Sequence, residues 1–268
     1  MAITAKDVMA LRQKTGLGMM ECKEALTEVD GDVDKAVDLL RQRGLAKMDS
    51  RSERTSAEGR INAAVSDDGS KGAIVEINSE TDFTASNDAF LAMADTVATE
   101  AIKGEPGEVV TNDAMKAAID EVRLTTKENI QFARGAVLGG PGSTVGQYVH
   151  FTGKVGVLIE LDGKADDALL KDLCMHISAV SPAPLGVTED EVPAEVVEKE
   201  REIAKAQAIE SGKPEQIAEK MVEGKIRKFY DETVLLRQPF IKDDKKQIKD
   251  LLPNGVTIKK FVRYQVGG

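Results

Sequence analysis

The apolar residues at the amino end of the chain recur at the spacing of short amphipathic helices. Thr4, followed three residues later by Asp7, has the pattern of a capping box at the start of the first helix. A second apolar run ends at Gly31, and Asp32 then caps a third run that we expect to end at Gly44. Because such a bundle buries only a marginal core, we expect it to dock on something else.

The hydrophobic pattern of the central chain occurs twice, in the order strand, strand, helix. The first copy reads GRINAAV, GAIVEIN and NDAFLAMADTVATEAI, and the second reads GQYVHFT, GVLIELD and DDALLKDLCMHISAV. Between the second strand and the helix, the first copy holds five more residues than the second. The repeat predicts an α+β body with two similar lobes. The matched positions are Gly59 with Gly146, Gly72 with Gly156, Glu76 with Glu160, and Asp88 with Asp167.

A helix and then a strand are predicted between the two copies, closed by GGPGSTVG. We interpret these glycines as a turn, because no Gly-Lys-Ser or Gly-Lys-Thr follows as in a phosphate-binding loop. After the second copy come two helical runs, Ala194 to Glu210 and Glu215 to Phe229, separated by Gly212 and Pro214. Gly commonly follows one helix and Pro opens the next, so this order predicts a helical hairpin.

The hairpin should form an antiparallel coiled-coil arm with Lys and Glu on its outside. Its two helices are expected to meet through apolar residues, with Val196, Ile203 and Ile209 facing Ile217, Met221 and Phe229. The chain then returns through QPFIKDD and a short helix at KKQIKDLL. The final run, VTIKKFVRYQV, predicts a strand that joins the sheet of the second lobe.

These patterns divide the chain into successive parts. Segment 47–60 carries charges and small polar residues with almost no apolar periodicity, which indicates a linker or a solvated helix extension. The predicted parts are a helical domain over 1–53, a first core lobe over 54–140, a second lobe over 141–190, the coiled-coil arm over 191–229, and the return to the second lobe over 230–268.

The composition is that of a soluble globular protein, with 268 residues, 31% charged, 41% hydrophobic, and a mean hydropathy of −0.26. No apolar run reaches the roughly 18 residues of a membrane span, and the amino end lacks the order of a secretory signal. Cys22 and Cys174 lie in amphipathic patterns, which predict buried or half-buried thiols in a reducing compartment. We therefore expect a cytoplasmic protein.

The formal net charge of −10 argues against a general nucleic-acid binder, because neutralising phosphates requires clustered Lys and Arg that outnumber local acids. The expected partner is another protein or a small molecule. We expect no direct contact with nucleic acid and none with a membrane.

Phe83 stands in the polar connection between the second strand and the helix of the first copy, in a chain with no Trp. One interpretation is a hydrophobic staple at the start of that helix. If Thr84 were the N-cap, the staple partner of Phe83 would be the polar Asp88; if Ser86 were the N-cap, Phe83 would fall outside the pattern. The second copy has no counterpart of this aromatic residue.

The other interpretation is an exposed anchor that enters a pocket of a partner. Burying a phenyl ring in this way contributes roughly 2 to 3 kcal/mol, and aromatic anchors often dominate interfaces. The neighbouring Asp82 would add a carboxylate that can cap backbone N–H groups or compete for a cation.

Six stretches along almost the whole chain carry a resemblance to a known family. They are LRQKTGLGMMECKEAL, EINSETDFTASNDAF, YVHFTGKVGVLIEL, MHISAVSP, SGKPEQIAEKMVEGKIRKF and KKFVRYQVG. In this order they resemble the bacterial elongation factor Ts family, the guanine-nucleotide exchange factors of the GTPase elongation factor Tu. The resemblance implies a helical domain like a ubiquitin-associated domain, a two-lobed core and a coiled-coil arm. It also implies a translation factor without a cofactor or a chemical reaction of its own.

The resemblance assigns a role to the segment around Phe83. The family's TDF signature, here Thr81, Asp82, Phe83 and Thr84, intrudes near the nucleotide site of the GTPase and disturbs the Mg²⁺ ligation that holds GDP. Family members commonly carry Val where this chain has Thr84, a change that keeps the β-branched shape and adds a hydroxyl.

Further partner-binding positions follow from the same resemblance. Met19, Met20 and Lys23 match family residues that contact a helix of the GTPase, although two methionines after a glycine turn are also typical of a core. His150 matches a partner-contacting histidine, although a lone strand histidine is also typical of a satisfied surface residue. Ile241 lies in a segment that meets another domain of the GTPase, next to Lys242, where some relatives are apolar. His176, among apolar helix positions, reads as core.

Two other functions fit parts of the sequence. A small-molecule enzyme would use Glu76, Glu160, His150 and Asp82 as acid and base groups. Glu76 and Glu160, however, occupy equivalent repeat positions and read as strand-surface residues. A ubiquitin-binding adaptor would use only the amino-terminal helices and leaves the Phe83 segment and the arm without a role.

Overall fold

The computed structural model describes residues 3–49, 54–210, 212 and 214–268. Its helices and sheets confirm the predicted α+β class. The chain divides into two units: unit 1 comprises Met1–Asn62, Val75–Ala136 and Gln265–Gly268, and unit 2 comprises Ala63–Ile74 and Val137–Tyr264. The domain boundaries expected from the sequence stay predictions, and the junction at residues 50–53 lies outside the described residues.

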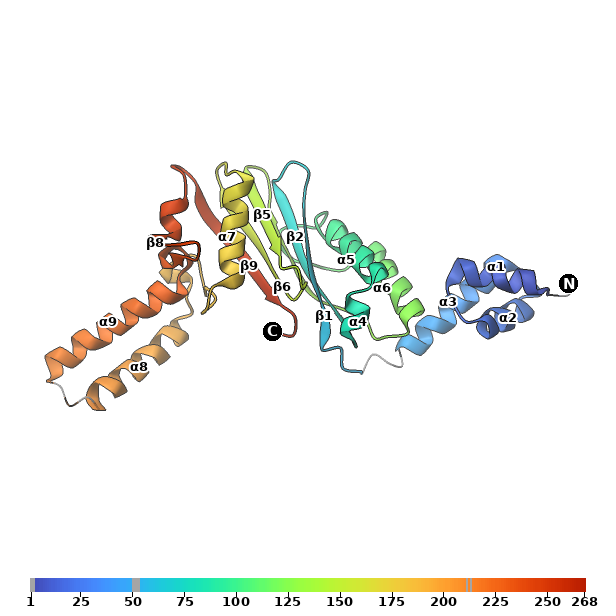
Figure 1. Cartoon of the computed structure of the whole chain (residues 1–268), viewed down its shortest axis with the longest axis horizontal. Helices are drawn as coiled ribbons and strands as arrows, with labels where there is room; N and C mark the ends of the chain where they lie inside the picture. The colour runs from blue at the N-terminus through green and yellow to red at the C-terminus, as the bar shows by residue number, and fades with distance from the viewer. Residues whose placement is uncertain (1–2, 50–53, 211, 213) are drawn as a thin grey trace. The chain divides into compact units, whose positions relative to one another are not determined.

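Unit 1 begins with three helices, drawn in blue in Figure 1: α1 (Ala5–Thr15), α2 (Met19–Glu28) and α3 (Val33–Asp49). The predicted capping box is present, since Thr4 Oγ1 accepts from Asp7 N and the Asp7 carboxylate accepts from Thr4 N. Asp32 caps α3 by accepting from Lys35 N. The small core between the helices includes Leu11, Cys22, Leu26 and Leu40.

The third helix corrects one prediction, because it continues through Gly44 to Asp49 instead of ending there. Gly44 lies against helix α6 (Asp113–Thr126), where a Cβ atom would stand 2.1 Å from Leu124 Cδ2. The glycine therefore permits a close approach of two helices. Through this contact the bundle docks on the rest of unit 1, as expected for so small a core.

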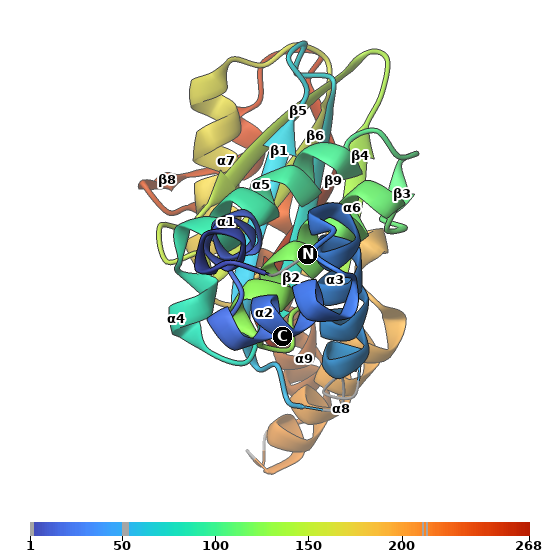
Figure 2. The same ribbon diagram turned by 90° about the vertical axis from the view of Figure 1, so that its right-hand side faces the viewer.

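The core of unit 1 contains a pair of helices, α5 (Asp88–Ala101) and α6, which pack against each other and lie side by side in Figures 1 and 2. One further turn, α4 (Asp82–Ala85), precedes α5. The neighbouring sheet has the strand order β1-β2-β4-β3. Its strands are β1 (Glu58–Val65), β2 (Lys71–Ser79), β4 (Gln131–Gly139) and β3 (Gly107–Glu108).

The sheet of unit 2 has the order β5-β6-β9, formed by β5 (Ser143–Val149), β6 (Val155–Asp162) and β9 (Thr257–Gln265). Helix α7 (Asp167–Ala179) packs on β5 and β6 (Figure 1). Strands β5 and β6 are antiparallel, with Gly146 opposite Ile159. A Cβ at Gly146 would stand 2.7 Å from Leu170 Cβ, so the glycine lets α7 lie close to the sheet. The repeat of strand, strand and helix, and the joining of the last strand, are confirmed.

Helices α8 (Ala194–Glu210) and α9 (Glu215–Thr233) pack side by side (Figure 1). Of the six residues predicted to join them, Val196, Met221 and Phe229 are half-buried. The shared core of the two helices is formed by Ala204, Ala208, Val222 and Ile226. Ile203, Ile209 and Ile217, expected in that core, are exposed. The small alanine side chains allow the helices to approach closely, and the larger isoleucines then fall on the flanks.

The remaining elements of unit 2 connect α7 to the helical pair and return the chain to the sheet. The predicted short helix at KKQIKDLL is a 3₁₀ turn that begins only at Ile248, because the lysines before it belong to a strand. The elements are η1 (Glu189–Glu191), η2 (Leu235–Arg237), β7 (Pro239–Phe240), β8 (Asp243–Gln247) and η3 (Ile248–Leu251).

Candidate functional site

Phe83 lies in α4, a single helical turn. Thr81 is its N-cap, and Thr81 Oγ1 accepts a hydrogen bond from Thr84 N at 3.2 Å. The polar connection around Phe83 thus contains a closed turn. Its first two residues, Asp82 and Phe83, point away from the core: Asp82 is exposed, and Phe83 is 84% exposed.

The helix after this turn begins at a residue that the sequence did not single out. Asn87 is the N-cap of α5 and accepts from Phe90 N at 2.7 Å, so neither Thr84 nor Ser86 has that role. The staple position immediately before the cap is therefore Ser86. Phe83 lies outside the pattern, and the staple interpretation is wrong.

The inner side of α4 is held by Glu128, on the segment between α6 and β4. Glu128 Oε1 accepts from Thr81 Oγ1 and from Thr84 Oγ1, each at 2.7 Å, and Glu128 Oε2 accepts from Thr81 N at 3.1 Å. Thr84 and Ala85 are buried. Sequence reasoning missed Glu128 because it stands 44 residues after Thr84, in a stretch with no motif of its own.

Met19, Met20 and Lys23 lie in the first turns of α2, and all three side chains are exposed. The buried positions of this helix are occupied by other residues, among them Cys22 and Leu26. The interpretation of the two methionines as core residues is therefore wrong. Both methionine side chains lie at the surface of the bundle.

Two consecutive residues after α6, Lys127 and Glu128, contact the two elements of unit 1 that carry predicted site residues, α2 and α4. Lys127 Nζ lies 3.3 Å from Glu21 Oε2, within the turn that carries Met20 and Lys23, and the next residue is Glu128, which holds α4. Lys127 ends α6 in the left-handed conformation, with φ of 61°. The other predicted site residues, His150 and Ile241, belong to unit 2.

His150 lies at the turn between β5 and β6. Its Nδ1 is 2.8 Å from Thr152 Oγ1, and its ring centroid is 4.3 Å from that of Phe151. Phe151 is 85% exposed. Sequence reasoning passed over this second exposed phenylalanine, although it follows His150 directly in YVHFTG.

Ile241 is exposed on the turn between β7 and β8, and a buried histidine holds its backbone. His176 Nδ1 accepts from Ile241 N at 3.3 Å, and His176 Nε2 lies 3.0 Å from Gln238 Oε1. Desolvation by burial lowers the pKa of His176, although the hydrogen bond with Gln238 opposes this. The assignment of His176 to the core is confirmed. Lys242 pairs with Asp172 of α7 at 2.7 Å.

Glu76 and Glu160 are not surface residues, as the sequence suggested, but buried members of ion pairs. Glu76 lies 2.7 Å from Arg134, and Glu160 lies 2.7 Å from Lys259. Desolvation is the largest influence on Glu160 and would raise its pKa, but hydrogen bonds, led by that from Lys259, outweigh it and lower the pKa. Each carboxylate is thus engaged within its own unit, which argues against their use as an acid and base pair.

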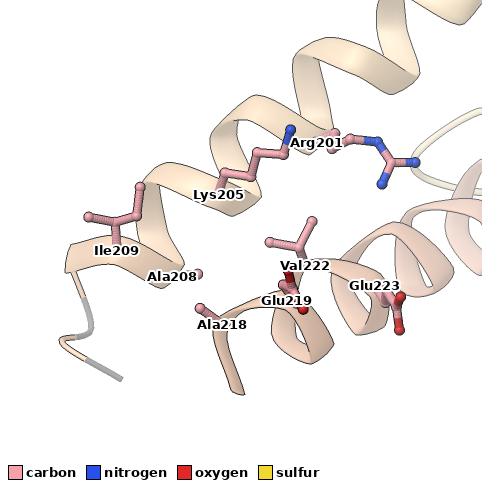
Figure 3. A pocket seen from close by; sticks show the side chains of 8 residues that line it. All are labelled: Arg201, Lys205, Ala208, Ile209, Ala218, Glu219, Val222 and Glu223. Carbon is pink, nitrogen blue, oxygen red and sulfur yellow. The ribbon is translucent and has the colours of Figure 1, made fainter. Parts of the chain in front are cut away.

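A groove of about 570 Å³ lies between α8 and α9, shown in Figure 3. Small apolar side chains form its floor and charged side chains its rims. The lining residues are Arg201, Lys205, Ala208, Ile209, Ala218, Glu219, Val222 and Glu223. Within the described ranges, no group of His, Cys, Asp and Glu is placed to hold a metal ion, and no helix has the length and apolarity to cross a membrane. Both cysteines are buried, as predicted.

Known proteins resemble this chain along its full length. The family described as elongation factor TS matches residues 80–268. Elongation factor Ts of Alkalilimnicola ehrlichii is 48% identical over 275 residues, covering 100% of this chain and 93% of the relative. The chain belongs to the elongation factor Ts family. Elongation factor Ts of Methylococcus capsulatus is 48% identical over 276 residues, and that of Halorhodospira halophila is 44% identical over 275 residues. Each of these alignments also covers 100% of this chain. Members of this family are translation elongation factors.

Proposed function

We propose that the chain binds the GDP form of elongation factor Tu and promotes release of the nucleotide. It acts as a guanine-nucleotide exchange factor, without a chemical reaction or a cofactor of its own, and it also binds the nucleotide-free GTPase. Its place of action is the cytoplasm, without direct contact with nucleic acid or with a membrane.

One observation carries the proposal: a largely exposed aromatic ring on a turn whose other side is fixed. Phe83 is 84% exposed, while Thr81 and Thr84 are bonded to Glu128. A ring held in this way can enter a pocket of the partner, and its burial contributes roughly 2 to 3 kcal/mol. Asp82, next to it, brings a negative charge toward the ligands of the Mg²⁺ ion that holds GDP.

Exchange follows from reciprocal coupling of the two ligands of the GTPase. If the factor weakens GDP binding, GDP weakens binding of the factor by the same free energy. A coupling of about 4 kcal/mol lowers the affinity for GDP on the order of 1000-fold. GTP then occupies the emptied site and releases the factor.

Other contacts supply the binding energy that offsets the lost phosphate and Mg²⁺ contacts. We assign these contacts to Met19, Met20 and Lys23 on a bundle like a ubiquitin-associated domain, and to His150 and Ile241 in unit 2. The pair α8 and α9 is a coiled-coil arm. The exposure of the two methionines and of Ile241 supports these assignments.

The test is the release of fluorescent GDP from elongation factor Tu, measured by stopped flow with the intact protein and with Phe83→Ala. We expect the variant to reduce the maximal release rate by at least about tenfold, equivalent to about 1.4 kcal/mol. Val110→Ala is the matched control, since Val110 is an apolar residue of unit 1 with 87% exposure. No acceleration by the intact protein would refute the function, and full acceleration by Phe83→Ala would remove the ring from the mechanism.

A further inference from the structure

We infer that Glu128 is a positioning residue for exchange: it holds the α4 turn in the conformation that presents Phe83. The inference rests on the proposed function. The Glu128 carboxylate accepts one hydrogen bond from the backbone of Thr81 and two from the hydroxyls of Thr81 and Thr84. It therefore ties the N-cap and the third residue of the turn to one group from a distant segment.

The turn needs such support because it is short. Helix α4 has four residues, and an isolated helix of this length does not form in water, since nucleation fixes several residues for a single bond. Its own backbone bonds are long: Ala85 N to Thr81 O is 3.2 Å, Ser86 N to Phe83 O is 3.3 Å and Asn87 N to Thr84 O is 3.2 Å. One shorter bond closes the turn from within, from Ser86 Oγ to Asp82 O at 2.8 Å. The exposed ring of Phe83 adds little burial to order it. Hydrogen bonds to a carboxylate are shorter and stronger than neutral ones, so the Glu128 bonds supply much of the order.

Glu128 is itself well placed to act as a fixed point. Glu128 is half-buried, and Thr84, whose hydroxyl donates a hydrogen bond to it, is buried. Water therefore competes weakly for these bonds. The next residue, Asn129, is fully buried, and its backbone N donates to Glu80 Oε1 at 2.7 Å. The preceding Lys127 pairs with Glu21 of α2. The carboxylate is thus anchored on both sides along the chain.

The consequence for function is preorganisation. A ring that is already presented in one orientation loses less conformational entropy on insertion than a ring on a loose loop. Glu128 acts through α4 and has no assigned contact with the partner. The Thr84 hydroxyl contributes one of the three bonds.

The first experiment needs no partner. The chain has no Trp, so Phe83→Trp creates a single fluorescent reporter at the tip of the turn. We expect Glu128→Gln in this background to lower the fluorescence anisotropy of the reporter, because the amide keeps the shape but replaces one acceptor oxygen with a donor that faces Thr81 or Thr84. Glu121→Gln is the matched control: it makes the same change at an exposed position of α6. An unchanged anisotropy in the Glu128 variant overturns the positioning role.

The second experiment measures exchange with Phe83 intact. Glu128→Gln should lower the maximal rate of GDP release about tenfold, equivalent to about 1.4 kcal/mol, and change the half-saturating concentration less than about threefold. Thr84→Val, which removes one bond and keeps the shape, should lower the rate about twofold and add little on top of Glu128→Gln. Circular dichroism melting verifies that each variant is folded.

The outcomes separate this inference from the function on which it rests. If the intact protein does not accelerate release, the proposed function fails, and the anisotropy still decides whether Glu128 orders the turn. If the anisotropy falls while the maximal release rate stays unchanged, the link between this order and exchange is refuted.

Discussion

The two copies of the internal repeat share a scaffold and differ in the connection between strand and helix. In the first copy, residues 80–87 join β2 to α5 and contain the α4 turn, whereas residues 163–166 join β6 to α7 directly. Helix α5 begins after Asn87 and helix α7 after Asp166, and each cap accepts from the backbone N three residues later. The scaffold therefore forms with or without the additional residues, and these carry the exposed Phe83.

A second comparison concerns what the copies have in common. At equivalent strand positions each holds a buried glutamate, and each glutamate pairs with a cation on a neighbouring strand: Glu76 with Arg134 of β4, and Glu160 with Lys259 of β9. The shared positions thus carry bonds that stabilise each sheet, and the additional connection carries the group that we propose to meet the partner. The following predictions test this division.

The largest effect is expected from deleting residues 81–85, which gives the first connection nearly the length of the second. GDP release should lose at least about 100-fold of its acceleration, equivalent to about 2.7 kcal/mol. The melting temperature should fall by only about 2–4 °C, which corresponds to about 1 kcal/mol for a protein of this size.

Five glycines in place of residues 81–85 provide the control, because they keep the length and remove the ring and the turn. Both variants should lose acceleration alike in the stopped-flow assay. Substantial acceleration in either would show that the additional connection is dispensable.

Removing the glutamate of the first copy should cost more stability than removing that of the second. The side chains of Glu76 and Arg134 are 3% and 35% exposed, so Glu76→Ala leaves a largely buried Arg134 without its carboxylate partner. We therefore expect a loss of about 2–3 kcal/mol in the free energy of unfolding. Glu160→Ala should cost about 1 kcal/mol less, since Lys259 is half exposed and water can hydrate it.

Urea unfolding followed by circular dichroism measures both losses, with the exposed Glu108→Ala as the control. Equal and small losses for Glu76→Ala and Glu160→Ala would mean that the buried pairs do not stabilise the two sheets as we argue.

The two exposed phenylalanines should act on different kinetic quantities. Phe151→Ala, next to His150, should raise the half-saturating concentration in the release assay by about 5–10-fold, which corresponds to about 1–1.4 kcal/mol. It should leave the maximal rate unchanged, whereas Phe83→Ala lowers that rate. A lower maximal rate with Phe151→Ala would end the distinction between the two rings.

The smallest effect concerns pH and the helices of the two copies. Counted from Asp88 and Asp167, the position of His176 in α7 corresponds to that of the buried Val97 in α5. Burial lowers the pKa of His176 below its usual 6.5 in the native state. As pH falls below about 6.5, the histidine of the unfolded chain therefore becomes protonated before that of the native protein. Stability should therefore be complete above about pH 6.5 and decrease as pH falls toward the lowered pKa.

His176→Val, which copies the first lobe, should remove this dependence when urea midpoints are compared between about pH 5 and pH 8. Glu160, whose pKa is also lowered, titrates in both proteins and cancels in the comparison. An identical pH dependence in the variant would exclude His176 as its source.

Local chemistry explains which features the sequence could predict. The capping box at Thr4, the cap at Asp32 and the repeat depend on residues near one another in the chain, and all three are present. The exposure of Phe83 followed from a pattern that left it without an apolar partner. Each of these inferences needed only spacing and residue type.

Predictions failed where a residue's surroundings come from distant segments. Gly44 reads as a helix end until Leu124 of another helix is placed against it. The buried glutamates look like ordinary polar positions of a strand, because their cations lie 58 and 99 residues away. Between α8 and α9, a helical period permits two adjacent stripes of contact residues, and the choice of Ala204 over Ile203 depends on how closely the helices approach. Glu128 was missed for the same reason.

The turn that carries Phe83 begins at its own cap, Thr81, and the following helix begins at another, Asn87. Substitutions at Asp82 and Phe83 therefore disturb no bond on which the flanking strand or helix depends. A lineage can alter its choice of partner at these two positions while the folding of the domain is inherited unchanged.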